Sequence, residues 1–184
     1  MPFPLETDRL TIAPLAHTHA EAFVAYRRDP EVARYQSWGT DYSLDDATRL
    51  IDGQHDGRLP MPGHWLQLAV QDRRSAELLG DLALHRSPDQ PDTFEIGMTL
   101  APAAQHRGIA FEAVEALLEF VFEQEHAHRV TAFCDSRNAP VARLLTRLGF
   151  RHESTAVEAD WFKDEWTTLE GYALLARERE AAAL

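Results

Sequence analysis

The segment from residue 93 to residue 134 constrains the fold more than any other part of the chain. Thr93 to Leu100 alternates like a strand, and from Ile109 to about Glu125 the apolar residues fall on one helical face. Arg129 to Cys134 is β-branched and aromatic enough for a buried strand. A strand, helix, strand passage makes a right-handed crossover between parallel strands. The sequence therefore predicts an α+β fold with one parallel step in an otherwise antiparallel sheet.

The remaining patterns predict one domain built around this unit. Further strands are expected near residues 9–12, 65–70, 78–85, 151–158 and 166–175, and further helices at residues 17–28, from residue 44, and at residues 138–149. Ser43 to Asp46 has the form of a capping box, Asn138 is placed to cap its helix, and Gly149 to end it. No repeat or linker interrupts residues 1–184, so we expect a single domain of about seven strands and about four helices with a charged helical tail.

Charge and residue counts exclude several classes of partner. The 18 Lys and Arg against 30 Asp and Glu give a formal charge of -12, which argues against nucleic acid as a partner. One cysteine rules out a disulfide framework, and the histidine pairs lack a metal spacing such as H-E-x-x-H, so no metal is expected. No apolar run could span a membrane, and Met1 to Leu5 lacks the character of a signal peptide. We therefore expect a cytoplasmic protein.

The loop between the strand at 93–100 and the following helix has the composition of an anion site. Gly108 has no Cβ to block close approach of a ligand to the backbone, and the first amides of a helix are unpaired donors. Arg107 adds a cation, so a pyrophosphate could be held mainly by backbone N–H groups. The pattern Q-x-x-G-x-A at Gln105 to Ala110 is, by itself, equally typical of a turn glycine.

The surrounding residues make the pattern more specific. Gln105 to Ala110 resembles the acetyl-CoA motif of the GNAT N-acetyltransferase superfamily, written Q/R-x-x-G-x-G/A. Glu95 to Leu100 upstream, Asn138 downstream and Leu148-Gly149-Phe150 stand where that resemblance requires them. Residues 7–12, 34–38 and 160–166 resemble the RimJ/RimL-like branch, whose named members acetylate N-terminal amines of ribosomal proteins. The resemblance covers roughly residues 5–177.

This resemblance implies a fold, a co-substrate and a binding site. In a GNAT fold, the strands at 93–100 and 129–134 splay apart, and the pantetheine arm of CoA pairs with the first of them like an extra strand. The residues carried over to acetyl-CoA binding are Met98, Thr99, Leu100, Gln105, His106, Arg107, Gly108, Ile109, Ala110 and Asn138. Tyr35 and Trp38 are carried over to the acceptor pocket, although an aromatic pair before a helix also suits a satellite core.

Two acidic residues are candidates for the base that deprotonates the amine. The resemblance favours Asp160, which could equally be a solvated turn residue; Glu95 is second, because its strand borders the cleft, and it could instead bind a loop or face solvent. Val141 and Leu145 replace the Ser and Tyr that protonate the leaving thiolate in other members. The acid stays open, with solvent or Tyr35 as alternatives.

Two further features of the sequence have simple structural interpretations. Cys134 lies in an apolar run and is interpreted as a small buried residue, so direct acyl transfer is favoured over an acyl-enzyme. The glutamates that recur every three or four residues, Glu112, Glu115, Glu119 and Glu123, are interpreted as a solvated helix face.

The sequence thus favours an acyl-CoA-dependent N-acyltransferase that moves the acetyl group of acetyl-CoA directly to a primary amine. A protein N-terminus is the first choice of acceptor. The alternatives are an antibiotic or polyamine acetyltransferase, and a CoA-binding module that has lost catalysis. The negative charge suits a cationic acceptor of either size. A homodimer is left open.

Overall fold

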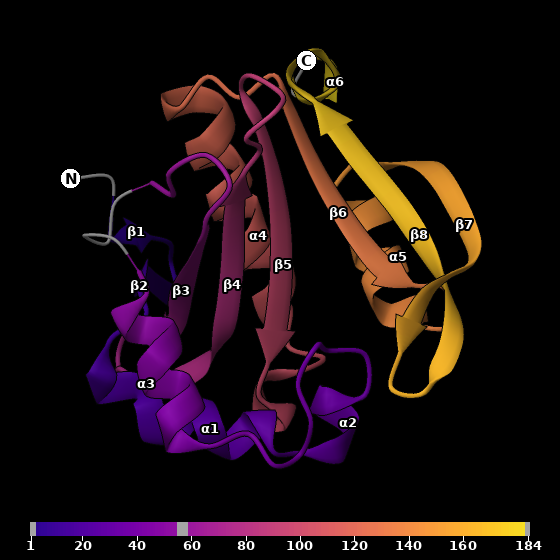
Figure 1. The fold of residues 1–184 in the computed structure, drawn as a ribbon. Helices are drawn as coiled ribbons and strands as arrows, with labels where there is room; N and C mark the ends of the chain where they lie inside the picture. The colour runs from indigo at the N-terminus through magenta and orange to yellow at the C-terminus, as the bar shows by residue number, and fades with distance from the viewer. Residues whose placement is uncertain (1–2, 55–58, 183–184) are drawn as a thin grey trace.

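The computed structural model describes residues 3–54 and 59–182, which form one eight-stranded sheet with helices on both faces (Figure 1). The sheet order is β1-β2-β3-β4-β5-β6-β8-β7. The strands are β1 (Leu5–Glu6), β2 (Leu10–Pro14), β3 (Trp65–Asp72), β4 (Leu78–Arg86), β5 (Thr93–Leu100), β6 (Arg129–Asp135), β7 (Arg151–Phe162) and β8 (Glu165–Leu175). The fold is the predicted α+β class; β1 is the strand that the sequence patterns missed.

The helices divide into two layers. One face of the sheet, turned toward the viewer in Figure 1, carries α1 (Ala20–Arg27), α2 (Pro30–Ala33) and α3 (Leu44–Asp52), and we call it the α1 face. The other, the α4 face, carries α4 (Ile109–Glu119) and α5 (Ala139–Arg147). The short helices η1 (His17–His19) and η2 (Pro102–Ala104), the π-helical turn η3 (Phe120–Gln124) and α6 (Ala176–Ala182) complete the chain.

The predicted parallel step lies between β5 and β6, and it opens the sheet. The β5–β6 ladder has three pairs, ending at Glu95 opposite Thr131, whereas every other ladder is antiparallel. Beyond this ladder β5 runs on to Leu100 and β6 to Asp135 without pairing to each other. The two strands therefore splay apart toward their carboxyl ends, as Figure 1 shows.

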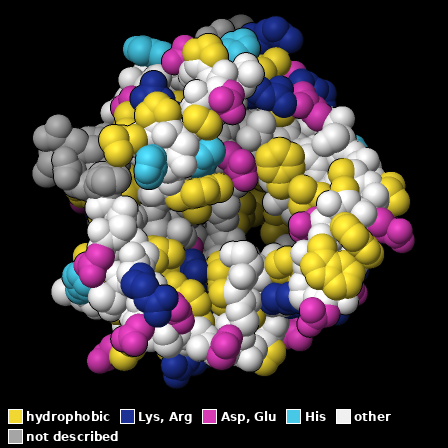
Figure 2. Space-filling view, viewed as in Figure 1, with side chains coloured by type: hydrophobic (Ala, Val, Ile, Leu, Met, Phe, Trp, Pro, Cys, Tyr) yellow, Lys and Arg dark blue, Asp and Glu magenta, His cyan; other side chains and the backbone are white. Residues whose placement is uncertain are grey.

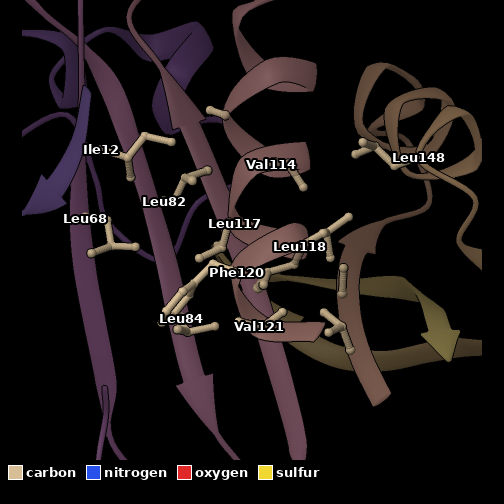
Figure 3. Close-up of a cluster of buried hydrophobic side chains, with 14 of the residues drawn as sticks. Ile12, Leu68, Leu82, Leu84, Val114, Leu117, Leu118, Phe120, Val121 and Leu148 are labelled. Carbon is tan, nitrogen blue, oxygen red and sulfur yellow. The ribbon is translucent and has the colours of Figure 1, made fainter. Parts of the chain in front are cut away.

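The main core lies between the sheet and α4. Alternate side chains of β2, β3 and β4, including Ile12, Leu68, Leu82 and Leu84, meet the apolar face of α4 (Figure 3). That face has the predicted helical spacing: Val114, Leu117 and Leu118 of α4, and Val121 in the η3 turn that follows, are all 0% exposed. Burial of these side chains supplies most of the driving force that holds the crossover helix against the sheet.

A second core fixes α1 to β4 on the α1 face. Asp81 of β4 is 1% exposed and accepts hydrogen bonds from Tyr26, Gln67 and, at 3.2 Å, from Nη2 of Arg27. The Arg27 guanidinium lies between the rings of Phe23 and Trp38, at 3.9 and 3.6 Å from their centroids. These contacts hold the segment that leads into α2 against the sheet.

Several local predictions are confirmed and others need correction. Ser43 and Asp46 form the capping box, and Gly149 follows α5 with φ +87°. Asp29-Pro30 ends α1 but also begins α2, because Asp29 accepts hydrogen bonds from the first amides of α2. Asn138 stands at the N-cap position of α5 but makes no side-chain capping bond.

Parts of the predictions fall outside the described residues: Met1 and Pro2, 55–58, and the last two residues of the tail. No helix in the part of the chain that the structure describes has the length and apolar character to cross a membrane.

Candidate active site

A cavity of about 600 Å³ lies where β5 and β6 splay apart. Its walls come from α2 and the residues after it, from the end of β5, from the loop and first turn of α4, and from α5. Because α2 is on one face of the sheet and α4 and α5 are on the other, the cavity passes through the gap between the two strands. Of the ten residues predicted to bind acetyl-CoA, nine line it: Met98, Thr99, Leu100, Gln105, His106, Gly108, Ile109, Ala110 and Asn138.

The loop before α4 has the backbone shape that an anion site needs. Gly108 has φ +76° and His106 has φ +59°, so two left-handed residues turn the chain sharply into the helix. A Cβ at Gly108 would have only the Nη2 of Arg9 within 4 Å, at 3.6 Å. Space therefore remains beside the glycine for a ligand, next to the unpaired amides at the N-terminus of an 11-residue helix.

Thr7 and Arg9, in the turn between β1 and β2, hold this loop from outside the cavity. Thr7 Oγ1 donates to Glu112 at 2.5 Å, and Arg9 Nε donates to the same carboxylate at 2.6 Å. Arg9 Nη1 also donates to the Arg107 carbonyl at 3.1 Å, directly before Gly108. Burial would raise the pKa of Glu112, but the hydrogen bonds from Thr7 and Arg9 outweigh it and lower that pKa.

Glu112 therefore does not belong to a solvated helix face, which corrects the interpretation of the glutamate stripe. Glu115 also has a partner, because Nη2 of Arg179 donates to it at 2.8 Å. Residues 7–12 supported the family resemblance, but nothing in the sequence pairs Arg9 with a glutamate 103 positions away.

Two arginines differ from what the sequence suggested. Arg107 does not line the cavity, and its Nη1 lies 3.4 Å from the Ala103 carbonyl. Arg147 of α5 does line it, with its guanidinium 4.4 Å from the centroid of the Phe111 ring. Arg147 has no carboxylate partner among the described residues. Arg147 is therefore the cavity-wall arginine best placed to meet an anion, and the motif did not point to it.

Asn138 and the residue before it, Arg137, line the cavity at the start of α5. Since the Asn138 side chain does not cap the helix, its amide is left to the cavity. Arg137 is committed elsewhere: its Nε donates to Asp135 at 2.9 Å and its Nη1 to Glu165 at 2.9 Å. The Arg137 hydrogen bonds lower the pKa of Asp135. This pair fixes the loop that presents Asn138.

Of the two predicted acceptor-pocket residues, only one is on the cavity wall. Tyr35 lines the cavity, and its hydroxyl donates to the Arg137 carbonyl at 3.4 Å across the opening. Trp38 does not line it, because the indole stacks on Arg27 and its Nε1 donates to the Arg27 carbonyl at 3.1 Å. For Trp38 the satellite-core alternative is the one observed.

Glu95 lies on the α1 face of β5, at the closed end of the splay. Its neighbours Phe94 and Ile96 point into the core on the α4 face, so the Glu95 side chain points the other way. The carboxylate is half-buried and has no hydrogen-bond or ion-pair partner among the described residues. Burial raises its pKa. Like Asp160, Glu95 is not on the cavity wall; it lies where the β5–β6 ladder ends. A half-buried carboxylate without a partner has the character of a proton acceptor.

Asp160 lies near the end of the β7–β8 hairpin. It pairs with Thr167, whose Oγ1 donates to the Asp160 carbonyl at 3.3 Å, and its side chain is not on the cavity wall. Two contacts join the hairpin to the rim of the cavity: the Arg137–Glu165 pair, and the Lys163 Nζ that donates to the Ala33 carbonyl at 2.5 Å. Asp160 is thus near the opening rather than at the splay.

No thiol or hydroxyl acid stands at the family positions. Val141 lines the cavity and Leu145 is fully buried in the core. Cys134 is buried as expected, and burial together with Glu170 and Asp135 raises its pKa to about 11, so it stays a thiol at neutral pH. Within residues 3–54 and 59–182, no group of three or more His, Cys, Asp or Glu side chains could hold a metal ion.

A mixed sheet whose one parallel pair splays beside a glycine-headed helix defines an acyltransferase of the GNAT type. The chain matches the family model described as the acetyltransferase (GNAT) domain over residues 9–151, so it belongs to that family and is an acyl-CoA-dependent N-acyltransferase. It is 27% identical over 177 residues to the uncharacterized N-acetyltransferase YnaD of Bacillus subtilis, covering 95% of this chain and 98% of YnaD.

Solved structures show the same fold. A GNAT-family acetyltransferase from Bacillus anthracis superposes with a TM-score of 0.84 at 24% identity, covering 95% of this chain and 99% of that one. The spermidine N-acetyltransferase of Vibrio cholerae, solved with CoA and spermine, gives a TM-score of 0.80 at 18% identity, covering 94% and 98%.

Proposed function

We propose that this protein transfers the acetyl group of acetyl-CoA directly to the α-amine at the N-terminus of a protein or peptide in the cytoplasm, as a RimJ/RimL-like member of its family. The observation that carries this proposal is the cavity through the sheet. Its α4-face end holds the loop to which we assign the pyrophosphate, and Glu95, outside the cavity wall, lies on the α1 face where β5 and β6 part. A donor and an acceptor could therefore meet from opposite faces.

The residues of the α4 face fit acetyl-CoA. Gly108, Ile109 and Ala110 offer backbone amides to the pyrophosphate, and Arg147 adds a cation without a carboxylate partner. Met98 to Leu100 lie on the stretch of β5 that has no β6 partner, where a pantetheine arm could pair with the backbone. Asn138 faces it from α5.

Glu95 is the base that we favour, and Asp160 is the second candidate. The attacking amine must lose a proton, and a carboxylate whose pKa is raised by burial is a better acceptor than an exposed one. An α-ammonium has a pKa of about 8, whereas a lysine or polyamine ammonium is near 10. The smaller mismatch with Glu95 favours an N-terminal α-amine.

The tetrahedral intermediate and the leaving group need no further side chain. A backbone amide near Met98 could donate to the developing oxyanion. With Val141 and Leu145 at the family's acid positions, CoA would leave as a thiolate and take its proton from solvent. An ordinary thiol has a pKa of about 8.5, so the thiolate is a competent leaving group.

The test is release of CoA thiol from acetyl-CoA in the presence of peptides with free N-termini, the same peptides with blocked N-termini, spermidine and aminoglycosides. The proposal expects turnover only with free N-termini. Turnover with spermidine or aminoglycosides alone would establish the small-amine alternative. Binding of CoA without turnover on any amine would make the protein a CoA-binding module.

A further inference from the structure

The α1 face has a hollow beside Glu95, floored by small residues. Ala83 and Gly97 are directly opposite each other on β4 and β5, two pairs along the ladder from His85 and Glu95 and therefore on the same face. A Cβ at Gly97 would meet only the Cβ of Ala83, at 3.6 Å, so the space above is open. Figure 2 shows a hollow at the centre of this face, with hydrophobic side chains on both sides of it.

Aromatic rings stand on both sides of this floor. On the β3 side, Trp65 pairs with His85 and stacks on it with centroids 4.8 Å apart, yet the indole is 47% exposed. On the β6 side, Phe133 is also 47% exposed and lies across Gly171, where an added Cβ would be 3.1 Å from the ring. Alternation along β3 and β6 places both rings on the α1 face, because Leu66 and Ala132 point into the opposite core.

The charges on this face leave one carboxylate for a ligand at the hollow. Asp81 is bound by Arg27, and Asp135 and Glu165 are bound by Arg137. Glu95, opposite His85, has no partner among the described residues. Asp160, on the same face and also without an ion pair among them, is on β7, three strands away from Glu95 in the sheet. A polyamine needs several carboxylates spaced along its chain, whereas this hollow offers one carboxylate between apolar walls.

Resting on the proposed transfer to an amine, we infer that the acceptor carries one ammonium next to a large apolar or aromatic group. The ammonium would be held at Glu95, and its apolar neighbour would occupy the hollow between Trp65 and Phe133. An N-terminal residue such as Phe or Leu has this chemistry, and so does a free arylalkylamine. Exposed aromatic rings beside a carboxylate favour such a cation both by contact area and by cation–π attraction.

The test measures kcat/KM for four-residue peptides that differ only in the first residue, Phe, Leu, Ser or Gly, and for phenethylamine, ethylamine and spermidine. We expect Phe and Leu peptides to exceed the Gly peptide by about tenfold or more, and spermidine to fall below them. A preference for the peptides over phenethylamine identifies a protein acceptor, and the reverse identifies a free amine. Either result supports the inference.

Two variants test whether Trp65 and Phe133 produce the preference for a large apolar first residue. W65A and F133A should each lower kcat/KM for the Phe peptide about tenfold while leaving the Gly peptide and the KM for acetyl-CoA unchanged. L44A, on α3, removes a side chain that is 48% exposed and should change neither. Melting temperatures confirm that each variant is folded.

The inference is overturned if the first residue of the peptide has no effect, if spermidine is preferred, or if both aromatic variants keep the full preference. Failure of the proposed function itself looks different: no amine of any kind is acetylated by a protein that still binds CoA.

Discussion

The loop before α4 and the part of β5 around Glu95 are built on opposite principles. At the α4 face the side chains that hold the loop from outside are all paired: Thr7 and Arg9 bind Glu112, and Arg9 also binds the Arg107 carbonyl. At the α1 face Glu95 is half-buried with no partner among the described residues. A loop that binds a ligand of fixed shape benefits from rigidity. A base must keep its lone pairs free for the substrate proton. Burying Glu95 without a partner costs free energy when its carboxylate is ionised.

Glu95→Gln should have the largest effect. Loss of a general base typically costs about 10²- to 10⁴-fold in kcat, and we expect the KM for acetyl-CoA to stay unchanged because the loop around Gly108 is not touched. Steady-state kinetics with a saturating peptide acceptor measures both constants. A kcat within threefold of wild type would transfer the role of base to another group.

The same substitution should not destabilise the fold. Because burial raises the pKa of Glu95 above its unfolded value, ionisation costs stability as pH rises through the folded pKa. A glutamine has no such cost, so the melting temperature of Glu95→Gln near pH 8 should equal or exceed that of wild type. A clear loss of melting temperature would mean that Glu95 has a structural role instead.

Gly108→Glu should act at the other end and weaken CoA binding by at least 100-fold, with the protein still folded. The substitution puts bulk and negative charge where the pyrophosphate is expected, at a φ of +76°. Gly108→Ala is the control for backbone strain, which costs about 1–2 kcal/mol for a left-handed residue. Calorimetric titration with CoA separates the two, and equal affinity for Gly108→Glu and wild type would refute the assignment of the loop.

Arg9→Met should have a smaller effect, confined to the binding of acetyl-CoA. It leaves the Glu112 carboxylate uncompensated at the start of α4 and frees the Arg107 carbonyl, so we expect the KM for acetyl-CoA to rise about tenfold with kcat and the acceptor KM unchanged. Adding Glu112→Gln should recover part of the loss, because it removes the repelling charge. If Arg9→Met lowers kcat instead, Arg9 acts on more than the loop.

Asp160→Asn should have the smallest effect, within about twofold in kcat at neutral and at high pH, because Asp160 lies on the edge strand β7, and β6 and β8 separate it from β5 in the sheet. A loss that is larger at neutral pH than at high pH, where the amine is already deprotonated, would restore Asp160 as the base. Rates at pH 7 and pH 9 decide between the two carboxylates.

Local patterns in the sequence predicted most of the fold and most of the donor site. Hydrophobic periodicity located α4 and the strands around it, and the loop pattern located five residues of the cavity wall, Gln105, His106, Gly108, Ile109 and Ala110; the family resemblance added Met98, Thr99, Leu100 and Asn138. Both signals are local, since a helix face or a glycine turn is written in consecutive residues.

The features that sequence could not give depend on distant pairings. The helical spacing of Glu112 indicated a solvated residue, and only the fold shows that Arg9 forms an ion pair with it. The sequence left Trp38 open between the acceptor pocket and a satellite core, and only the fold shows that the Arg27 guanidinium stacks on its ring. Glu95 was a weaker candidate than Asp160 because the absence of a partner can be seen only when all neighbouring strands are in place. The preference between the two bases therefore came from the assembled sheet.

The most direct test of the account is the pH dependence of kcat for acetyl transfer to a peptide beginning with Phe, in wild type and Glu95→Gln. A base must be ionised, so the account predicts that wild-type kcat falls as pH decreases through a pKa above the ordinary carboxyl range, and that Glu95→Gln is slow at every pH and lacks this limb. A Glu95→Gln protein with the wild-type rate and the same limb would contradict it.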